Sequence, residues 1–203
     1  DGIATNELLD GQDPDKLFLE RDLKFLKEPK GDKPGGRMVI VLPRQNLSGT
    51  QQSSVELRKW LLKQAKITAI VDLPREAFQP HTGTKTSLVF LEKVKDPESD
   101  YKIFMAVSEA VGHDRRGNPI YRKDDSGKFV LDGENNPRIW NDLPEIKDQW
   151  DNYQKGIKPK SITPSCFVIS SEQLRNDPSY RIDAWYWDPN KNDLAKSLMD
   201  YTG

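Results

Sequence analysis

Apolar and charged positions alternate with helical spacing in two segments of the first half of the chain. In DKLFLERDLKFLK, residues 15–27, the apolar positions Leu19, Leu23 and Leu26 recur at i, i+4 and i+7 with charges between them. This spacing predicts an amphipathic helix lying on a core. VELRKWLLKQA, residues 55–65, shows a similar apolar face and predicts a second helix.

Four short apolar runs predict strands. RMVIVLP, residues 37–43, is nearly unbroken and β-branched, a pattern typical of a strand buried on both faces. ITAIVDL at 67–73, TSLVFLEKV at 86–94 and YKIFMAVSE at 101–109 follow it. Strands that alternate with helices favour right-handed parallel crossovers. The sequence therefore predicts the trailing half of an α/β sheet.

RMVIVLP also bears on what lies upstream. An apolar strand with an open edge invites association, so we expect its partner strand before Asp1. The chain does not begin with methionine, and we expect it to belong to a longer protein. The segment DGIATNELLDGQ has neither the basic region nor the apolar core of a secretory signal.

The pattern changes from about Val111 onward. GHDRRGNPIYRKDDSGKFVLDGENNPRIWNDLP is polar and turn-rich, and it predicts an irregular excursion with at most one hairpin. LPEIKDQWDNYQKG then predicts a short helix, and SCFVIS a short strand. The aromatic run Trp185–Trp187 is expected to cover part of the domain or of a partner subunit. The predicted division is 1–110 as a sheet domain and 111–203 as a loop-rich, α+β extension, a possible subunit-docking region.

Composition excludes several classes of site and partner. The formal net charge is −1, so a contact with nucleic acid requires a local patch rather than a global field. With Cys166 as the single cysteine and His81 and His113 as the only histidines, neither an internal disulfide nor a Cys/His zinc site is possible. The longest apolar run, MVIVL, is far shorter than the roughly 20 residues of a membrane span. These features favour a reducing, cytoplasmic setting.

Familiar catalytic motifs are missing. Gly112 and Gly117 have the spacing of phosphate-loop glycines, but Asn118 and Pro119 stand where Lys and Ser/Thr are required. No G-x-G-x-x-G follows a strand, and no nucleophile elbow is present. Carboxylates are scattered over solvated helix faces. Nothing in the chain predicts a hydrolase or a kinase.

The stretch from Leu17 to Lys93 resembles a known family. LFLERDLKFLKEPKGDKPGGRMVIVLP, followed by ELRKWLLKQAKITAIVDLPREAFQPHTGTKTSLVFLEK, is similar to the later part of the catalytic domain of DNA adenine-N6 methyltransferases. It is most like the methylation subunits of type I restriction-modification systems. The resemblance implies a Rossmann-like methyltransferase sheet with 37–43 as fifth strand, 67–73 as sixth, and 86–94 as an antiparallel seventh between them.

The resemblance also shows what this chain lacks. The family's glycine-rich S-adenosylmethionine loop and its Asn-Pro-Pro-aromatic motif both precede the fifth strand, and neither occurs here. NNPR at 135–138 has one proline and no following aromatic. That motif aligns the adenine nitrogen for attack on the sulfonium methyl group, so this segment is not expected to transfer methyl groups alone. S-adenosylmethionine is the methyl donor implied for the parent protein, and no catalytic residue is assigned here.

Phe78, in REAFQP, is the position that matches the family's target-base residue. A methyltransferase acting on a duplex swings the adenine out of the stack and holds it against apolar or aromatic faces. The resemblance implies that Phe78 packs on this base. The alternative is that Phe78 folds back into the core and anchors its loop.

Three basic residues at the predicted strand ends, Arg44, Arg75 and Lys85, are candidates for contacts with the DNA backbone. Ligands of open α/β sheets bind at the carboxyl ends of the strands, and phosphate contacts position a duplex without reading its sequence. HTGTKTS around Lys85 has a structural interpretation as well, because its hydroxyl groups can satisfy backbone groups in a turn.

The sequence thus predicts the carboxy-terminal part of an adenine-specific DNA methyltransferase subunit from the cytoplasm of a prokaryote. The implied partners are DNA and the specificity and restriction subunits of the same system, with no membrane partner. One alternative is a non-catalytic DNA-binding or subunit-assembly module that retains part of the sheet. A second is a nucleotide-binding α/β domain of another kind.

Overall fold

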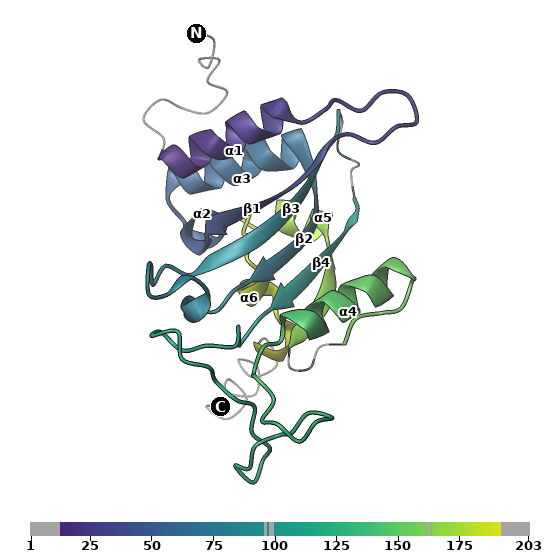
Figure 1. Ribbon diagram of the computed structural model, residues 1–203. Coiled ribbons are helices and arrows are strands. Elements are labelled where there is room, and N and C mark those ends of the chain that lie inside the picture. The colour runs from purple at the N-terminus through teal and green to yellow at the C-terminus, as the bar shows by residue number, and fades with distance from the viewer. Residues whose placement is uncertain (1–12, 96, 98–99, 161, 163, 192–203) are drawn as a thin grey trace, which may run out of the picture.

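The computed structural model describes residues 13–95, 97, 100–160, 162 and 164–191 (Figure 1). Within these residues five strands form one sheet: β1 Arg37–Pro43, β2 Ala65–Asp72, β3 Thr86–Lys93, β4 Lys102–Val107 and β5 Ser165–Ser170. The helices are α1 Pro14–Phe25, α2 Arg44–Ser48, α3 Gln52–Gln64, α4 Leu143–Gln154, α5 Ser171–Asn176 and α6 Ala184–Trp187, with a 3-10 turn η1 at Arg75–Phe78. The segment DGIATNELLDGQ, interpreted above as lacking a signal, lies outside the described residues.

The strand order β1-β3-β2-β4-β5 confirms the predicted arrangement of the central strands. β3 is antiparallel to both β1 and β2 and lies between them, with Val89 opposite Ile40 on one side and Ile70 on the other. β4 runs parallel to β2 and places Val107 beside Asp72. The carboxyl ends of β1, β2 and β4 therefore meet the start of β3 at one edge of the sheet, called the carboxyl edge below.

The larger core lies between the sheet and the pair α1 and α3. Leu19 and Leu23 of α1 and Leu57 and Leu61 of α3 are buried against strand residues such as Ile67. Both helices therefore present the apolar faces that their spacing predicts. Burying one such side chain contributes about 1.5–3 kcal/mol, so this layer supplies much of the stability of the described fold.

The opposite face of the sheet holds a smaller core under α4. Phe104 of β4 is buried there and packs edge-to-face on Trp150 of α4, with ring centroids 5.3 Å apart. Ile146 of the same helix is buried beside it. The helix predicted from LPEIKDQWDNYQKG is thus confirmed, and its apolar side faces the sheet.

β1 differs from its prediction. It is the outer strand of the described sheet, and Val39 and Val41 are 55% and 43% exposed. Met38 and Ile40 point to the opposite face and pack on the larger core. The expectation of burial on both faces is wrong for the described residues, because nothing among them packs over Val39 and Val41.

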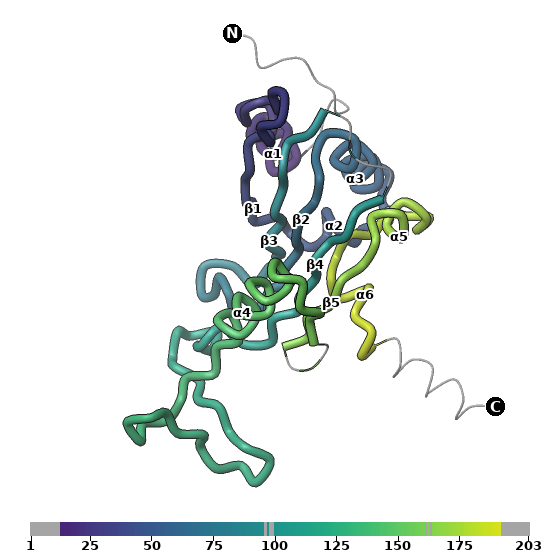
Figure 2. The backbone as a smooth tube through the Cα atoms, turned by 90° about the vertical axis from the view of Figure 1, so that its right-hand side faces the viewer, coloured from purple at the N-terminus to yellow at the C-terminus, as the bar shows by residue number. Residues whose placement is uncertain are grey.

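The polar excursion is more ordered than predicted. Within residues 111–141, all of them described, three short hairpins replace the single hairpin that was the most expected, closed by the pairs His113–Pro119, Lys123–Phe129 and Leu131–Pro137. This segment, called the arm below, extends away from the sheet in both views (Figures 1 and 2). Each hairpin is too short to show a strand pattern, which is why apolar periodicity missed them.

Candidate functional site

The loop that carries Phe78 leaves the carboxyl edge at the end of β2. Phe78 is the last residue of η1 and its side chain is 39% exposed. Its neighbour Ala77 is the residue of this turn that packs on the smaller core. The backbone N–H of Thr82 donates to the Phe78 carbonyl at 3.1 Å and closes the loop behind it. Phe78 thus presents a partly exposed aromatic surface from a turn that is anchored by another residue.

Local hydrogen bonds hold this loop between the two strands. The backbone N–H of Leu73 donates to the carbonyl of Thr86 at 3.0 Å, which joins the end of β2 to the start of β3. At the tip, the N–H of Thr84 donates to the hydroxyl of Thr82 at 3.2 Å. The structural interpretation of the hydroxyl-rich HTGTKTS stretch is confirmed, since its hydroxyl groups satisfy backbone groups in the turn.

The three basic candidates lie at the carboxyl edge but in different environments. Arg75 in η1 and Lys85 before β3 are exposed and form no ion pair within the described part of the chain. The backbone N–H of Arg44 donates to the carbonyl of Lys85 at 2.9 Å, so β1 ends where this loop returns. The Arg44 guanidinium, however, faces two carboxylates, Asp72 at 3.7 Å and Asp183 at 3.3 Å.

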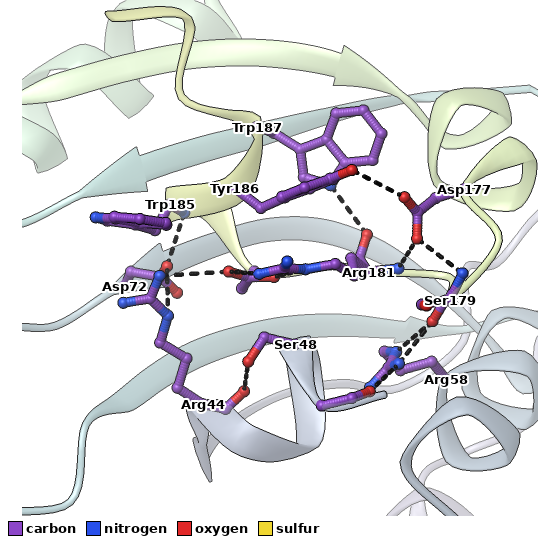
Figure 3. Close-up of polar contacts among 12 residues, drawn as sticks. Arg44, Ser48, Arg58, Asp72, Asp177, Ser179, Arg181, Trp185, Tyr186 and Trp187 are labelled. Carbon is purple, nitrogen blue, oxygen red and sulfur yellow. Dashed lines mark hydrogen bonds and ion pairs between the residues drawn. The ribbon is translucent and has the colours of Figure 1, made fainter. Parts of the chain in front are cut away.

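Asp72, the last residue of β2, is the centre of a buried polar network (Figure 3). One carboxylate oxygen accepts the hydroxyl of Ser87 at 2.5 Å, and the other accepts the backbone N–H of Trp185 at 2.8 Å. Burial raises the pKa of the Asp72 carboxyl, while the Ser87 hydroxyl and the Arg44 guanidinium act in the opposite direction. These donors satisfy a carboxylate that would otherwise be costly to bury.

Asp183 extends this network toward the C-terminal segment. Its side chain is fully buried, and Arg181 donates to its two oxygens, from Nε to one and from an amino nitrogen to the other, each at 3.1 Å. The Arg44 guanidinium carbon lies 5.0 Å from the ring centroid of Trp185, a cation–π contact. Two carboxylates and two guanidinium groups thus alternate at the carboxyl edge.

A second buried cation fixes the same C-terminal segment from the helical side (Figure 3). The guanidinium of Arg58 in α3 donates to the carbonyls of Asn46 and Gly49 at 2.7 Å each and of Ser179 at 2.6 Å. Burial lowers the pKa of Arg58 to about 10, which leaves it charged at neutral pH. Charge-assisted bonds of this kind are stronger than neutral ones.

The aromatic run cover part of the domain, one of the two expected roles. Trp187 packs on the larger core and its indole N–H donates to the carbonyl of Arg181 at 2.9 Å. Trp185 and Tyr186 remain 45% and 38% exposed. Only the last of the three aromatics is therefore used mainly for packing within the described residues.

Sequence reasoning missed Asp72, Ser87 and Asp183. One signal was available for Asp72, which is a charged residue directly after a fully apolar strand segment. Asp183 gave none, because its partner Arg44 lies 139 positions earlier and no spacing pattern connects them. The network depends on long-range contacts that apolar periodicity does not encode.

The described residues do not form a site for S-adenosylmethionine. β1 runs into Pro43–Arg44 and β2 into Leu73–Pro74, so neither ends in a glycine-rich turn. Both oxygens of Asp72 already accept hydrogen bonds within the chain. Among the described residues no three His, Cys, Asp or Glu side chains are grouped to hold a metal ion. No helix of the described chain has the length and apolar character needed to cross a membrane.

Solved structures with a similar fold are subunits of restriction-modification systems. A modification subunit of a putative type I restriction enzyme from Vibrio vulnificus YJ016 gives a TM-score of 0.53 at 20% identity, over 84% of this chain and 30% of that one. A chain from a structure titled "Structural basis underlying complex assembly and conformational transition of the type I R-M system" gives 0.57 at 21% identity, over 92% and 36%. The fold is thus that of a methyltransferase subunit, of which this chain spans a part.

Sequence comparison gives the family. Residues 20–168 match the N-6 DNA methylase family, and the chain belongs to it. The methylase subunit of the type I restriction enzyme EcoEI from Escherichia coli is 35% identical over 96 residues, which cover 46% of this chain and 18% of that protein. The resemblance to type I modification subunits is confirmed.

Proposed function

We propose that this chain is the carboxy-terminal part of the catalytic domain of an adenine-N6 DNA methyltransferase in a type I restriction-modification system. S-adenosylmethionine serves as methyl donor to the parent protein, and residues outside this chain complete its site. The observation that carries the proposal is Phe78, a partly exposed aromatic side chain at the carboxyl edge of a methyltransferase sheet.

Phe78 forms one wall of the pocket for the target adenine. An extruded base needs an apolar or aromatic face to replace the stacking that it loses, and such stacking contributes about 1–3 kcal/mol per base. The exposure of Phe78 supports this role over core anchoring. Ala77 makes the core contact of η1, so Phe78 is left available.

Arg75 and Lys85 contact DNA phosphates on either side of this pocket. Both are exposed and without an ion pair in the described residues, and both belong to the loop that carries Phe78. Arg44 is the third candidate, but Asp72 and Asp183 balance its charge. Its contribution to the DNA surface is therefore smaller, and its main role is to brace the edge.

The parent protein acts in a prokaryotic cytoplasm with the specificity and restriction subunits of its system. Type I systems are named in the titles of structures that share this fold. The loop-rich extension after residue 110 is the part of the chain that docks a neighbouring subunit or methylase domain.

The test of the proposal uses the full-length parent protein with its specificity subunit. Labelled methyl groups from S-adenosylmethionine are expected to appear at N6 of adenine in duplex DNA that carries the recognition sequence. Substituting the asparagine of the upstream Asn-Pro-Pro-aromatic motif serves as the inactive control. DNA binding without any methyl transfer by the unsubstituted protein contradicts the proposal.

A second candidate function is a non-catalytic module for DNA binding or subunit assembly. It is favoured by one observation, the absence of both the donor loop and the catalytic motif from this sequence. The coding sequence upstream of Asp1 separates the two candidates. A parent protein that lacks both motifs is the module, whereas one that has both is the enzyme.

A further inference from the structure

The arm is built around a closed ring of backbone hydrogen bonds. The N–H of Arg122 donates to the carbonyl of Arg138 at 2.8 Å, that of Arg138 to Val130 at 2.8 Å, and that of Val130 back to Arg122 at 2.9 Å. The three hairpins leave this junction in three directions. The arm therefore has an internal framework of its own, although it contains no regular strand.

All three hairpins use the same turn. In each, an aspartate carboxylate accepts the backbone N–H groups two and four positions later: Asp114, Asp124 and Asp132. The third position after each aspartate has positive φ, at Gly117, Gly127 and Asn135. The shared geometry presents different tip residues, which are Arg115 and Arg116 in the first hairpin, Asp125 and Ser126 in the second, and Gly133 and Glu134 in the third.

Side chains fix the arm to the body of the domain. Asp142, buried at its base, accepts the hydroxyl of Ser108 and the backbone N–H of Glu109, each at 2.6 Å. Glu145 of α4 pairs with Arg122 at 3.2 Å and with Arg138 at 2.7 Å. Since both arginines belong to the junction, the centre of the arm is braced against α4.

The arm starts at the carboxyl edge, where the Phe78 loop also starts. The N–H of Ser108 donates to the carbonyl of Asp72 at 2.9 Å, so the strand that leads into the arm is paired with the strand that leads to Phe78. Figures 1 and 2 show the arm extending beyond this edge. A duplex placed over Phe78 therefore has the arm beside it.

The first hairpin is the one that presents two adjacent cations. Arg115 and Arg116 are exposed and form no ion pair with any described residue. The Asp114 carboxylate is engaged by the backbone N–H groups of Arg116 and Asn118 and by the Asn118 side chain. The two guanidinium groups are thus available to an external polyanion.

We propose that Arg115 and Arg116 contact the phosphates of duplex DNA flanking the target adenine, an inference that rests on the proposed function. Guanidinium groups match phosphate oxygens in charge and in geometry. The contact positions the duplex and reads no sequence. A protein partner fits this tip less well, because the exposed apolar side chains Phe129 and Leu131 belong to the other two hairpins.

The test compares two double variants of the full-length protein in its complex. Arg115→Ser with Arg116→Ser removes two cations from the first hairpin, at turn positions where the second hairpin already carries Ser126. Lys123→Ser with Lys128→Ser removes the same charge from the second hairpin. DNA affinity is measured over a range of salt concentrations, because each phosphate contact contributes about 1 to the slope of log affinity against log salt.

The first variant is expected to reduce this slope by about 2 and the second to leave it unchanged. A wild-type slope in the first variant, or an equal loss in both, overturns the inference. Loss of subunit association with an unchanged slope also overturns it and identifies the tip as a protein contact. Methylation by the unsubstituted protein is measured alongside, since its absence rejects the proposed function whereas its presence with an unchanged slope rejects only this inference.

Discussion

The buried carboxylate of Asp72 accepts the backbone N–H of Trp185 at 2.8 Å, across 113 positions of sequence. Asp72 ends the strand from which the Phe78 loop departs, and Trp185 belongs to α6 in the C-terminal segment. The two ends of the described chain are therefore joined directly beneath the proposed base pocket. The C-terminal segment thus helps to form the site, in addition to any part that it plays in docking.

The hydrogen bond between Asp72 and Ser87 is expected to show strong energetic coupling. Asp72→Asn and Ser87→Ala each remove part of a buried, charge-assisted contact, and each is predicted to lower the free energy of unfolding by about 1–3 kcal/mol. Urea unfolding of both single variants and the double variant gives the coupling energy, predicted to be at least ~1 kcal/mol. Asp148→Asn on the exposed side of α4 is the control, and strictly additive losses contradict the prediction.

Arg58 is expected to be the most sensitive charged residue of the helical layer. Arg58→Met keeps the apolar stem but leaves the carbonyls of Asn46, Gly49 and Ser179 without their donor. We predict a loss of about 3 kcal/mol in the free energy of unfolding. Lys63→Met, at an exposed position of the same helix, is the matched control and is expected to change stability by less than about 0.5 kcal/mol. Equal effects of the two substitutions argue against the role of the Arg58 network.

Local patterns predicted the elements, and long-range polar contacts escaped them. Helical spacing found α1 and α3 because Leu19, Leu23 and Leu57 form faces that bury together. The resemblance placed β3 between β1 and β2, which periodicity alone does not determine. The Arg44–Asp183 pair had no local signature, since a charge on a surface loop and a charge in a buried network look alike in sequence.

The arm shows why irregular segments are hard to read. Its order depends on Asp114, Asp124 and Asp132, each of which organises a turn through its own carboxylate. Asp and Gly are favoured in all kinds of loops, so the composition indicated only a loop. Recognising the recurrence of an aspartate followed three positions later by Gly or Asn was the signal available.

Cys166 is expected to be unreactive in the folded protein. Its side chain is fully buried, and burial raises the pKa of the thiol to about 12, with the nearby Asp142 carboxylate adding to the effect. At pH 8 roughly one thiol in 10,000 is then ionised, and the thiolate is the reactive form. Since this chain contains one cysteine, mass spectrometry of the Cys166 peptide after iodoacetamide treatment measures it directly. Labelling is predicted only after denaturation.

The same thiol has a defined effect on stability at high pH. The unfolded chain loses the proton near pH 9, whereas the folded chain keeps it to about 12. Because the folded state binds more protons in this window, the contribution of Cys166 to stability falls as the pH rises through it. Cys166→Ala is expected to remove this part of the pH dependence, and an unchanged pH profile contradicts the assignment.

Phe78 is the residue on which the proposed function depends most. Phe78→Ala in the full-length methyltransferase removes the aromatic face and leaves the Ala77 contact with the core intact. The loss of about 1–3 kcal/mol of base stacking corresponds to a roughly 5- to 150-fold fall in kcat/KM for duplex DNA. Phe25→Ala, at an exposed aromatic position of α1, is the matched control.

The most direct measurement is kcat/KM for adenine methylation in duplex DNA by the Phe78→Ala variant, recorded together with its melting temperature. We predict a large fall in kcat/KM with a melting temperature within about 2 °C of the unsubstituted protein. A melting temperature lowered by several degrees with unchanged kcat/KM identifies Phe78 as a core anchor and contradicts its assignment to the adenine pocket.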